Sequence, residues 1–219
     1  MTHVVHPYAQ RLGILRDWKS RWFGSREQYR EYLKSDVLLR EFLEKKLRKF
    51  YISSVEMERS EKLLRIIIKT SRAGMIIGRS GEGALKLKNE VSSFLDKNKL
   101  SKPKELKIDI EEIRYPETDA AIVGMMVAEG LEKRLPFKRV LKTTVEKVSA
   151  NRDVKGVKIS LSGRLGGAEM ARRESLKKGR IPLQTLRADV DFTREKAHLP
   201  YGIVGIKVWI YRGEIFNKK

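Results

Sequence analysis

A cation between two closely spaced glycines is the first feature of this 219-residue chain that could bind a ligand. The loop Gly78-Arg79-Ser80-Gly81 lies between a short apolar stretch at 73–77 and a helix-like pattern. Glycine lets a backbone approach a phosphate closely, because no Cβ stands in the way. The free amides at the start of the next helix would face the same anion. We therefore predict that the loop holds a nucleic-acid backbone. Because such spacing is common by chance, this prediction depends on the surrounding elements.

A second glycine-rich segment, at 162–171, reads Ser-Gly-Arg-Leu-Gly-Gly-Ala-Glu-Met-Ala. It follows a strand-like run, and we expect a short helix at 168–177 after it. Its glycines lack the spacing of a Rossmann fingerprint, and the sequence has no Gly-Lys-Ser/Thr of a P-loop. The segment is either a tight turn or a contact with rRNA backbone, and we favour the contact because cations crowd it. These cations are Arg164, Arg172, Arg173, Lys177, Lys178 and Arg180.

Catalysis has little support in the sequence. The histidines His3, His6 and His198 are scattered and show no metal-ligand spacing. Asp189 and Asp191 share one face of a predicted strand and could form a metal pair, but we interpret them as salt-bridged to arginines. The chain has no cysteine, which excludes thiol catalysis and cysteine–zinc sites and is typical of a reducing cytoplasm. We predict no catalytic residue, metal or cofactor, and an enzyme acting on nucleic acid, such as a lyase using a lysine amine, is the disfavoured alternative.

The charge of the chain indicates a polyanionic partner. Lysine and arginine number 48 against 28 aspartates and glutamates, which gives a net charge of +20 and a pI near 10.1. Self-repulsion of this size opposes folding unless an anion compensates it. Residues 1–50 carry 12 basic and 6 acidic groups and residues 152–183 carry 9 and 3, whereas 116–151 is nearly balanced at 6 and 5. No apolar run approaches the ~18 residues of a membrane span and no signal peptide is evident, so we expect a cytoplasmic nucleic-acid binder without membrane contact.

Aromatic and cationic side chains are mixed in the first 36 residues. Rings can stack on unpaired bases while cations meet phosphates. The same rings could instead cover a neighbouring core, and both readings stay open. We expect the segment 1–36 to pack with the domain that follows it. Its candidates for rRNA contact are Arg11, Trp18, Lys19, Arg21 and Trp22.

The elements around the glycine loop follow one another in a defined order. Apolar periodicity predicts a helix at 37–50, strands at 52–58 and 63–69, helices at 73–77 and 84–94, and a strand at 106–111. Asp36 is the expected N-cap of the first helix. With its Gly-x-x-Gly loop between two helices, this αββααβ unit resembles the type II KH domain, which we place at 37–115. KH loops grip about four nucleotides of single-stranded backbone.

A second domain, at 116–219, is expected after Tyr115-Pro116, because the residue before a proline is pushed out of the helical region. Strands are predicted at 157–161, 186–192 and 203–211. The prediction is thus an α+β protein, with a KH domain followed by a two-layer α/β domain. The first helix of the second domain is striped by Ala121, Met125, Ala128, Leu131 and Leu135.

The second helix of this domain, at 137–150, has two contrasting sides. Lys138, Arg139 and Lys142 fall together on one side at ~100° per residue, so burial of the other side would make them project outward. The helical pattern by itself fits a solvated face as well as an RNA-facing one. The opposite side carries Phe137, Val140, Leu141, Thr144, Val145 and Val148.

Over nearly all of its length the chain resembles the bacterial S-three family of small-subunit ribosomal proteins. The three most family-specific matches lie in the C-terminal half. The matching stretches are Val5-His6-Pro7 with Arg11-Leu12-Gly13-Ile14, Gly74-Met75-Ile76-Ile77-Gly78, Ser162-Gly163-Arg164-Leu165-Gly166-Gly167-Ala168-Glu169, Pro182-Leu183-Gln184-Thr185-Leu186-Arg187-Ala188-Asp189 and Tyr201-Gly202-Ile203-Val204-Gly205-Ile206-Lys207-Val208-Trp209-Ile210.

The resemblance implies a structural constituent of the small-subunit head, bound to rRNA beside proteins ten and fourteen of that subunit. It also implies a place at the channel where mRNA enters, where Lys138, Arg139 and Lys142 would hold mRNA and help to unwind it. No homo-oligomer is expected. Family members often carry lysine in the variable part of the KH loop, and this chain departs from that pattern with Arg79-Ser80. A free-standing KH-type RNA-binding regulator is the alternative, and it leaves the matches in the C-terminal half unexplained.

Overall fold

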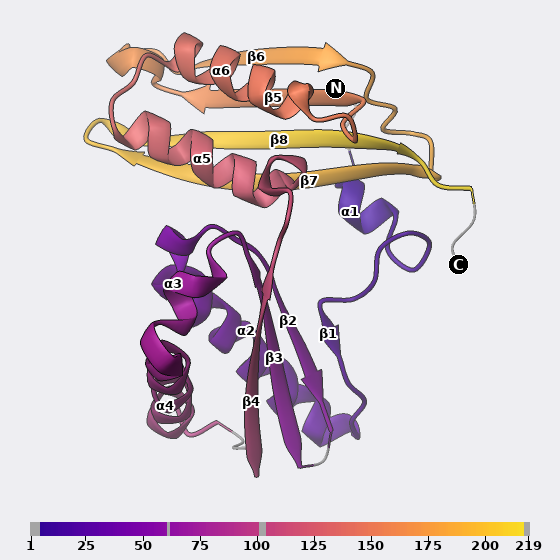
Figure 1. Cartoon of the computed structure of the whole chain (residues 1–219), viewed down its shortest axis with the longest axis vertical. Coiled ribbons are helices and arrows are strands. Elements are labelled where there is room, and N and C mark those ends of the chain that lie inside the picture. Colours follow the sequence, from indigo (N-terminus) through magenta and orange to yellow (C-terminus); the bar gives the residue numbers. More distant parts are fainter. Residues whose placement is uncertain (1–4, 61, 101–103, 217–219) are drawn as a thin grey trace. The chain divides into compact units, whose positions relative to one another are not determined.

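The computed structural model describes residues 5–60, 62–100 and 104–216. They form two compact units (Figure 1), which we call the KH unit and the C-terminal unit. The KH unit is Trp18–Arg114, and the C-terminal unit combines Met1–Asp17 with Tyr115–Lys219. Within the described ranges, no helix is both long and apolar enough to cross a membrane.

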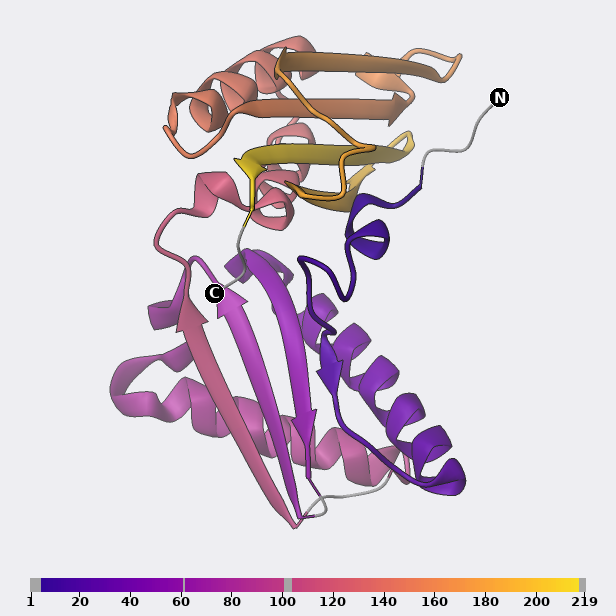
Figure 2. The ribbon, with the colours of Figure 1, turned by 90° about the vertical axis from the view of Figure 1, so that its right-hand side faces the viewer.

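The KH unit has the predicted αββααβ order, preceded by one short strand. Its sheet has the order β1-β2-β3-β4, in which β2 and β3 are antiparallel and the other two pairs are parallel. Helices α2, α3 and α4 lie on one side of this sheet (Figure 2). The elements are β1 (Ser20–Arg21), α2 (Arg26–Lys46), η1 (Arg48–Phe50), β2 (Ile52–Arg59), β3 (Leu63–Thr70), α3 (Ala73–Ile77), η2 (Arg79–Gly81), α4 (Glu82–Lys97) and β4 (Glu105–Glu112).

Helix α2 begins earlier than predicted, and Asp36 is not its N-cap. Ser25 caps the helix in a capping box, and its backbone amide donates to the side chain of Gln28 at 3.2 Å. Asp36 lies inside the helix and is buried. Its carboxylate accepts a hydrogen bond from the Trp22 indole at 2.8 Å and pairs with Arg59 at 2.7 Å. The predicted start was wrong because the first turns of α2 are polar, and apolar periodicity begins only near Leu39.

The C-terminal unit has a fully antiparallel sheet of order β6-β5-β8-β7. The short helix expected at 168–177 is wrong, since residues 172–179 form strand β6, paired along its whole length with β5. Together with the KH unit, this sheet confirms the predicted α+β class. The elements are α1 (Pro7–Gln10), η3 (Pro116–Thr118), α5 (Ala120–Glu132), α6 (Phe137–Ala150), β5 (Gly156–Gly163), η4 (Leu165–Gly167), β6, β7 (Ala188–Leu199) and β8 (Gly202–Glu214).

Helices α5 and α6 cover one face of this sheet, whereas α1 lies on the other side (Figure 2). Alternate residues of β5 and β8, such as Ile159 and Val208, are fully buried against the two helices. Helix α5 buries a face rotated from the predicted stripe, because Ala121 and Met125 are half-buried and Leu135 is exposed. The buried residues of α5 are Ala120, Ile122, Val123, Gly124, Val127, Ala128 and Leu131.

Residues up to Asp17 belong to the C-terminal unit and residues 18–36 belong to the KH unit, so the expectation that 1–36 packs with the KH domain holds only for its second part. Arg11 is fully buried in the C-terminal unit, and its guanidinium donates to the carbonyl of Ala188 at 2.6 Å and to that of Pro7 at 3.0 Å. Burial lowers the pKa of Arg11, while the charge of Asp189 acts in the opposite direction. A single residue thereby fixes α1 beside β7. Further acceptors of Arg11 are the carbonyls of Pro182, Leu183 and Thr185.

Candidate nucleic-acid interface

The glycine loop of the KH unit is exposed and turns through left-handed backbone. The φ angles are +71° at Gly78, +52° at Ser80 and +82° at Gly81. Helix α4 begins directly afterwards, and no side chain caps its first amides. These amides and the helix dipole therefore face the loop, where the exposed Arg79 adds a cation. The loop combines the donors that a phosphate requires.

Gly83, which we did not single out from the sequence, fixes how α3 meets α4. A Cβ at this position would lie 2.4 Å from the carbonyl oxygen of Ile76 and 2.9 Å from that of Ile77. Any larger residue would push the two helices apart and change the loop. Beside the loop, Met75 is 61% exposed and Ile77 is 38% exposed, which leaves apolar surface for bases. A third glycine just after the Gly-x-x-Gly was the available signal.

Helix α6 presents Lys138, Arg139 and Lys142 to solvent. Val140, Leu141, Val145 and Val148 bury the opposite side, which confirms the two-sided pattern. All three cations are exposed, and none forms an ion pair with another described residue. The helix therefore holds three uncompensated charges within two turns.

The segment at 162–171 is a braced turn. Gly166 and Gly167 have φ angles of +68° and +81°, and the Arg164 guanidinium donates to the carbonyl of Ala168 at 2.9 Å. Arg164 thus has a structural role inside the loop. The turn feeds strand β6 instead of the expected helix, so it is not built like a nucleotide-binding loop.

Strand β6 distributes its cations over both faces of the sheet. Arg172 lies over the Phe137 ring at 5.5 Å, and Lys178 donates to the Ser149 hydroxyl at 3.0 Å, so both lie on the side of α6. Arg173 and Lys177 alternate with these residues and point to the other side, while Arg180 is exposed after the strand.

The candidates in the N-terminal segment have different environments. Arg11 is fully buried and therefore cannot contact rRNA, which corrects its prediction as a contact residue. Arg21 pairs with Glu56 and Glu58, each at 2.9 Å. Trp22 packs against Tyr29 and Tyr32 and is bonded to Asp36, so the core-covering reading holds for this ring. Trp18 is 59% exposed and Lys19 is also exposed. These two remain accessible to RNA.

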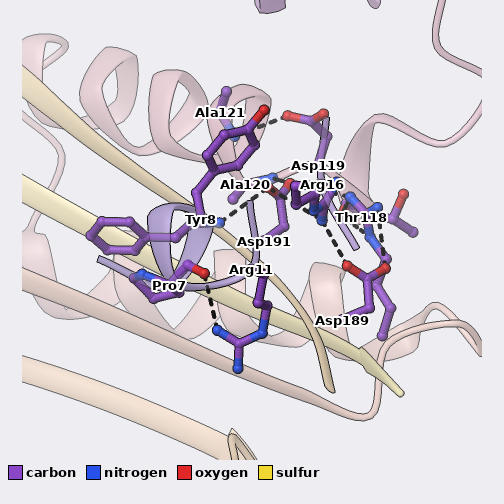
Figure 3. A network of polar contacts seen from close by, with 12 residues as sticks. Pro7, Tyr8, Arg11, Arg16, Thr118, Asp119, Ala120, Ala121, Asp189 and Asp191 are labelled. Carbon is purple, nitrogen blue, oxygen red and sulfur yellow. Dashed lines mark hydrogen bonds and ion pairs between the residues drawn. The ribbon is translucent and has the colours of Figure 1, made fainter. Parts of the chain in front are cut away.

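Asp189 and Asp191 form a salt-bridge network, as predicted (Figure 3). Arg16 approaches Asp189 at 2.7 Å and Arg212 approaches Asp191 at 3.1 Å. Asp191 also accepts the Ala120 amide at 2.9 Å and so anchors the start of α5. Among the described residues, no group of acidic or histidine side chains is arranged to hold a metal.

The histidines are not gathered into a site within the described residues. His6 packs edge-on against the Phe192 ring with centroids 4.7 Å apart. His198 is exposed on β7, and His3 lies outside the described residues.

Two family models match the chain. The model described as "Ribosomal protein S3, C-terminal domain" matches residues 127–210, and the KH domain model matches residues 38–118. The KH match covers the glycine loop and the sheet of the KH unit. The other match includes α6 and all four strands of the C-terminal sheet up to Ile210.

Curated relatives match over the full length of the chain. The small ribosomal subunit protein uS3 of Caldicellulosiruptor bescii is 43% identical over 219 residues, which cover 100% of this chain and 96% of the relative. The uS3 protein of Xanthomonas campestris is 43% identical over 217 residues, covering 99% and 86%. That of Shewanella loihica is 42% identical over 217 residues, covering 99% and 91%.

Proposed function

The chain belongs to the uS3 family of small ribosomal subunit proteins, and from this premise we propose that it is a structural constituent of the cytoplasmic ribosome. In this proposal it binds rRNA in the head of the small subunit, beside proteins ten and fourteen of that subunit. It also lines the channel where mRNA enters. The protein acts by binding and positioning RNA, with no catalytic group or cofactor.

The observation that carries the mRNA part of this proposal is the cationic side of α6. Lys138, Arg139 and Lys142 are exposed, unpaired within the described residues and fixed by the buried side of the same helix. Cations fixed in this way would bind the phosphates of separated mRNA strands while the ribosome pulls the message inward. Each phosphate neutralised on a single strand contributes roughly −0.7 to the salt slope of binding. No nucleotide hydrolysis by this chain is needed.

The KH loop supplies a second RNA contact in this proposal. Its uncapped amides and Arg79 suit a phosphate, and Met75 and Ile77 offer apolar surface to bases. The loop suits a short single-stranded stretch, because unpaired bases can turn toward apolar side chains.

Sedimentation of a cell lysate tests the ribosomal assignment. We expect the chain to cofractionate with small subunits in near-equal stoichiometry. A peak at the top of the gradient would instead favour a free-standing RNA-binding regulator.

Translocation through a stable mRNA hairpin tests the role of α6. Replacing Lys138, Arg139 and Lys142 by alanine should preserve subunit assembly and slow translocation on the hairpin more than on unstructured mRNA. Lys147→Ala is the matched control, because Lys147 is an exposed lysine of the same helix outside the trio. Equal slowing on both templates, or on neither, removes unwinding from the proposed function.

A further inference from the structure

The face of the C-terminal sheet that points away from α5 and α6 carries an ordered set of side chains. Leu176, Ile159, Val208 and Ala197 face the helices, so their neighbours along each strand face the other way. Strand register aligns these neighbours in three rows, which together we call the open sheet face. The rows are Lys177, Lys158, Trp209 and Phe192, then Ser175, Ser160, Lys207 and Arg194, then Arg173, Ser162, Gly205 and Lys196.

The open sheet face contains six cations and no acidic residue. Two like-charged pairs lie directly opposite each other on neighbouring strands, Lys158 with Lys177 and Arg194 with Lys207. Like charges placed in this way destabilise a sheet. The cost is removed when a polyanion lies across both members of each pair, which indicates that the face has an anionic partner.

Two of these cations form cation–π contacts with aromatic rings of the same row or the neighbouring one. Lys158 lies over the Trp209 ring at 5.2 Å, and Arg194 lies over the Phe192 ring at 5.5 Å. At this end of the face, Ile181 and Leu183 pack against the cluster that contains both rings, and His6 contacts the Phe192 ring, so the rings are only 7% and 9% exposed and cannot stack on bases. The middle of the face is lined by the small residues Ser160, Ser162 and Gly205. The face therefore offers charge without a platform for unpaired bases.

We propose that the open sheet face binds the phosphate backbone of double-stranded rRNA. Strands lie about 4.8 Å apart and successive rows about 7 Å apart, so the cations spread over a patch roughly 14 Å on each side. Duplex RNA is recognised mainly by its shape and its phosphates, whereas unpaired bases stack on exposed rings. A face with cations and without exposed rings therefore suits a duplex. The inference rests on the proposed function and adds Lys158, Arg194, Lys196 and Lys207 to the RNA-binding residues.

The salt dependence of binding to short RNA probes tests this proposal. The variant combines Arg173→Gln, Arg194→Gln and Lys207→Gln, and the probes are an RNA duplex and a single strand of the same length. For the duplex we expect the slope of log affinity against log salt to flatten by roughly 2 to 3 units, and for the single strand by less. The matched control Lys34→Gln, Lys45→Gln and Lys49→Gln removes the same charge at exposed positions of α2 and the turn after it.

An unchanged duplex slope in a folded triple variant overturns the proposal, as does an equal loss in the control. If the duplex slope is unchanged but the variant no longer joins small subunits, the face contacts an acidic protein instead of RNA. If the triple variant unfolds, Arg173→Gln with Lys177→Gln gives the same test at two exposed positions of an edge strand, with a smaller expected change. Failure of the wild-type chain to sediment with small subunits would refute the ribosomal assignment separately, since the duplex measurement does not depend on it.

Discussion

The open face of the KH sheet and the open sheet face of the C-terminal unit both carry charged side chains. Only on the KH sheet do cations lie next to acidic side chains. Glu56 on β2 pairs with Lys69 at 2.7 Å and with Arg21 at 2.9 Å. The hydrogen bond from Arg65 to Asp109 raises the pKa of that guanidinium. By register and ion pairing, the KH face holds the cations Arg21, Arg65, Lys69 and Lys107 and the acids Glu56, Glu58, Asp109 and Glu111.

This difference underlies the two modes of RNA binding that we propose for the chain. In the KH unit the charged side chains of the sheet pair with one another, and the loop at 78–81 is the part that we propose binds an anion. In the C-terminal unit the three rows of the open sheet face contain no acidic residue and no exposed ring. Phosphate contacts give affinity and orientation without reading bases, whereas a KH loop holds single strands whose bases are accessible. In this proposal, the KH loop therefore binds single-stranded RNA and the open sheet face binds duplex RNA.

The largest expected effect is a loss of stability on replacing Arg11, a buried cation of the C-terminal unit that donates hydrogen bonds to backbone carbonyls. Arg11→Met leaves several buried carbonyls without a donor, so the free energy of unfolding should fall by about 3 kcal/mol or more. Urea unfolding followed by circular dichroism measures this change. Arg180→Met, at an exposed position, is the matched control and should be nearly neutral. Equal midpoints for the two variants would show that Arg11 is not structural.

The second prediction removes the charge balance of the KH sheet. Glu56→Gln with Glu58→Gln leaves Arg21, Lys69 and Arg65 with fewer partners. We expect a loss of roughly 1 to 2 kcal/mol in stability, together with tighter non-specific binding of duplex RNA at low salt. Filter binding at two salt concentrations detects the gain. If affinity does not rise, charge balance is not what keeps RNA off this face.

A smaller effect is expected at the KH loop. Changing Arg79 and Ser80 to aspartate places like charge against a phosphate, so affinity for single-stranded RNA should fall about tenfold, equivalent to about 1.4 kcal/mol. Circular dichroism should stay native because both side chains are exposed. The alanine double variant is the control and should lose less. Native structure with unchanged affinity excludes the loop as a phosphate grip.

The smallest effect concerns one lysine of α6. Lys142→Ala should flatten the salt slope for single-stranded RNA by roughly 0.7, the contribution of one phosphate. Lys147→Ala should leave the slope unchanged. Isothermal binding measurements across a salt series are suited to a change of this size. The two variants behaving alike would place the mRNA contact elsewhere.

Much of the fold could be predicted from local patterns. The order of elements in the KH unit, the glycine loop and the two-sided α6 follow from periodicity over a few turns, because each pattern repeats within its own element. The start of α2 was missed because its first turns are mostly polar and show no apolar repeat. Strand β6 was missed because most of its own residues are charged, and because its pairing with β5 is a long-range property.

The candidate site was only partly predictable for the same reason. The alternation of Lys158 and Lys207 with apolar neighbours shows that each points away from a core, and this signal was present in the sequence. That these two strands pair and place the cations beside Arg194 depends on sheet order, which local sequence does not specify. The burial of Arg11 likewise depends on carbonyls more than 170 residues away in the sequence.

Ultraviolet cross-linking of assembled small subunits, followed by mass spectrometry, tests most directly the claim that RNA contacts one sheet face and avoids the other. Lysines of both faces can be compared within one sample, so differences in assembly do not affect the result. We predict RNA adducts at Lys158, Lys177 and Lys207 and none at Lys69 and Lys107. Adducts at Lys69 and Lys107 without adducts on the open sheet face would contradict the account.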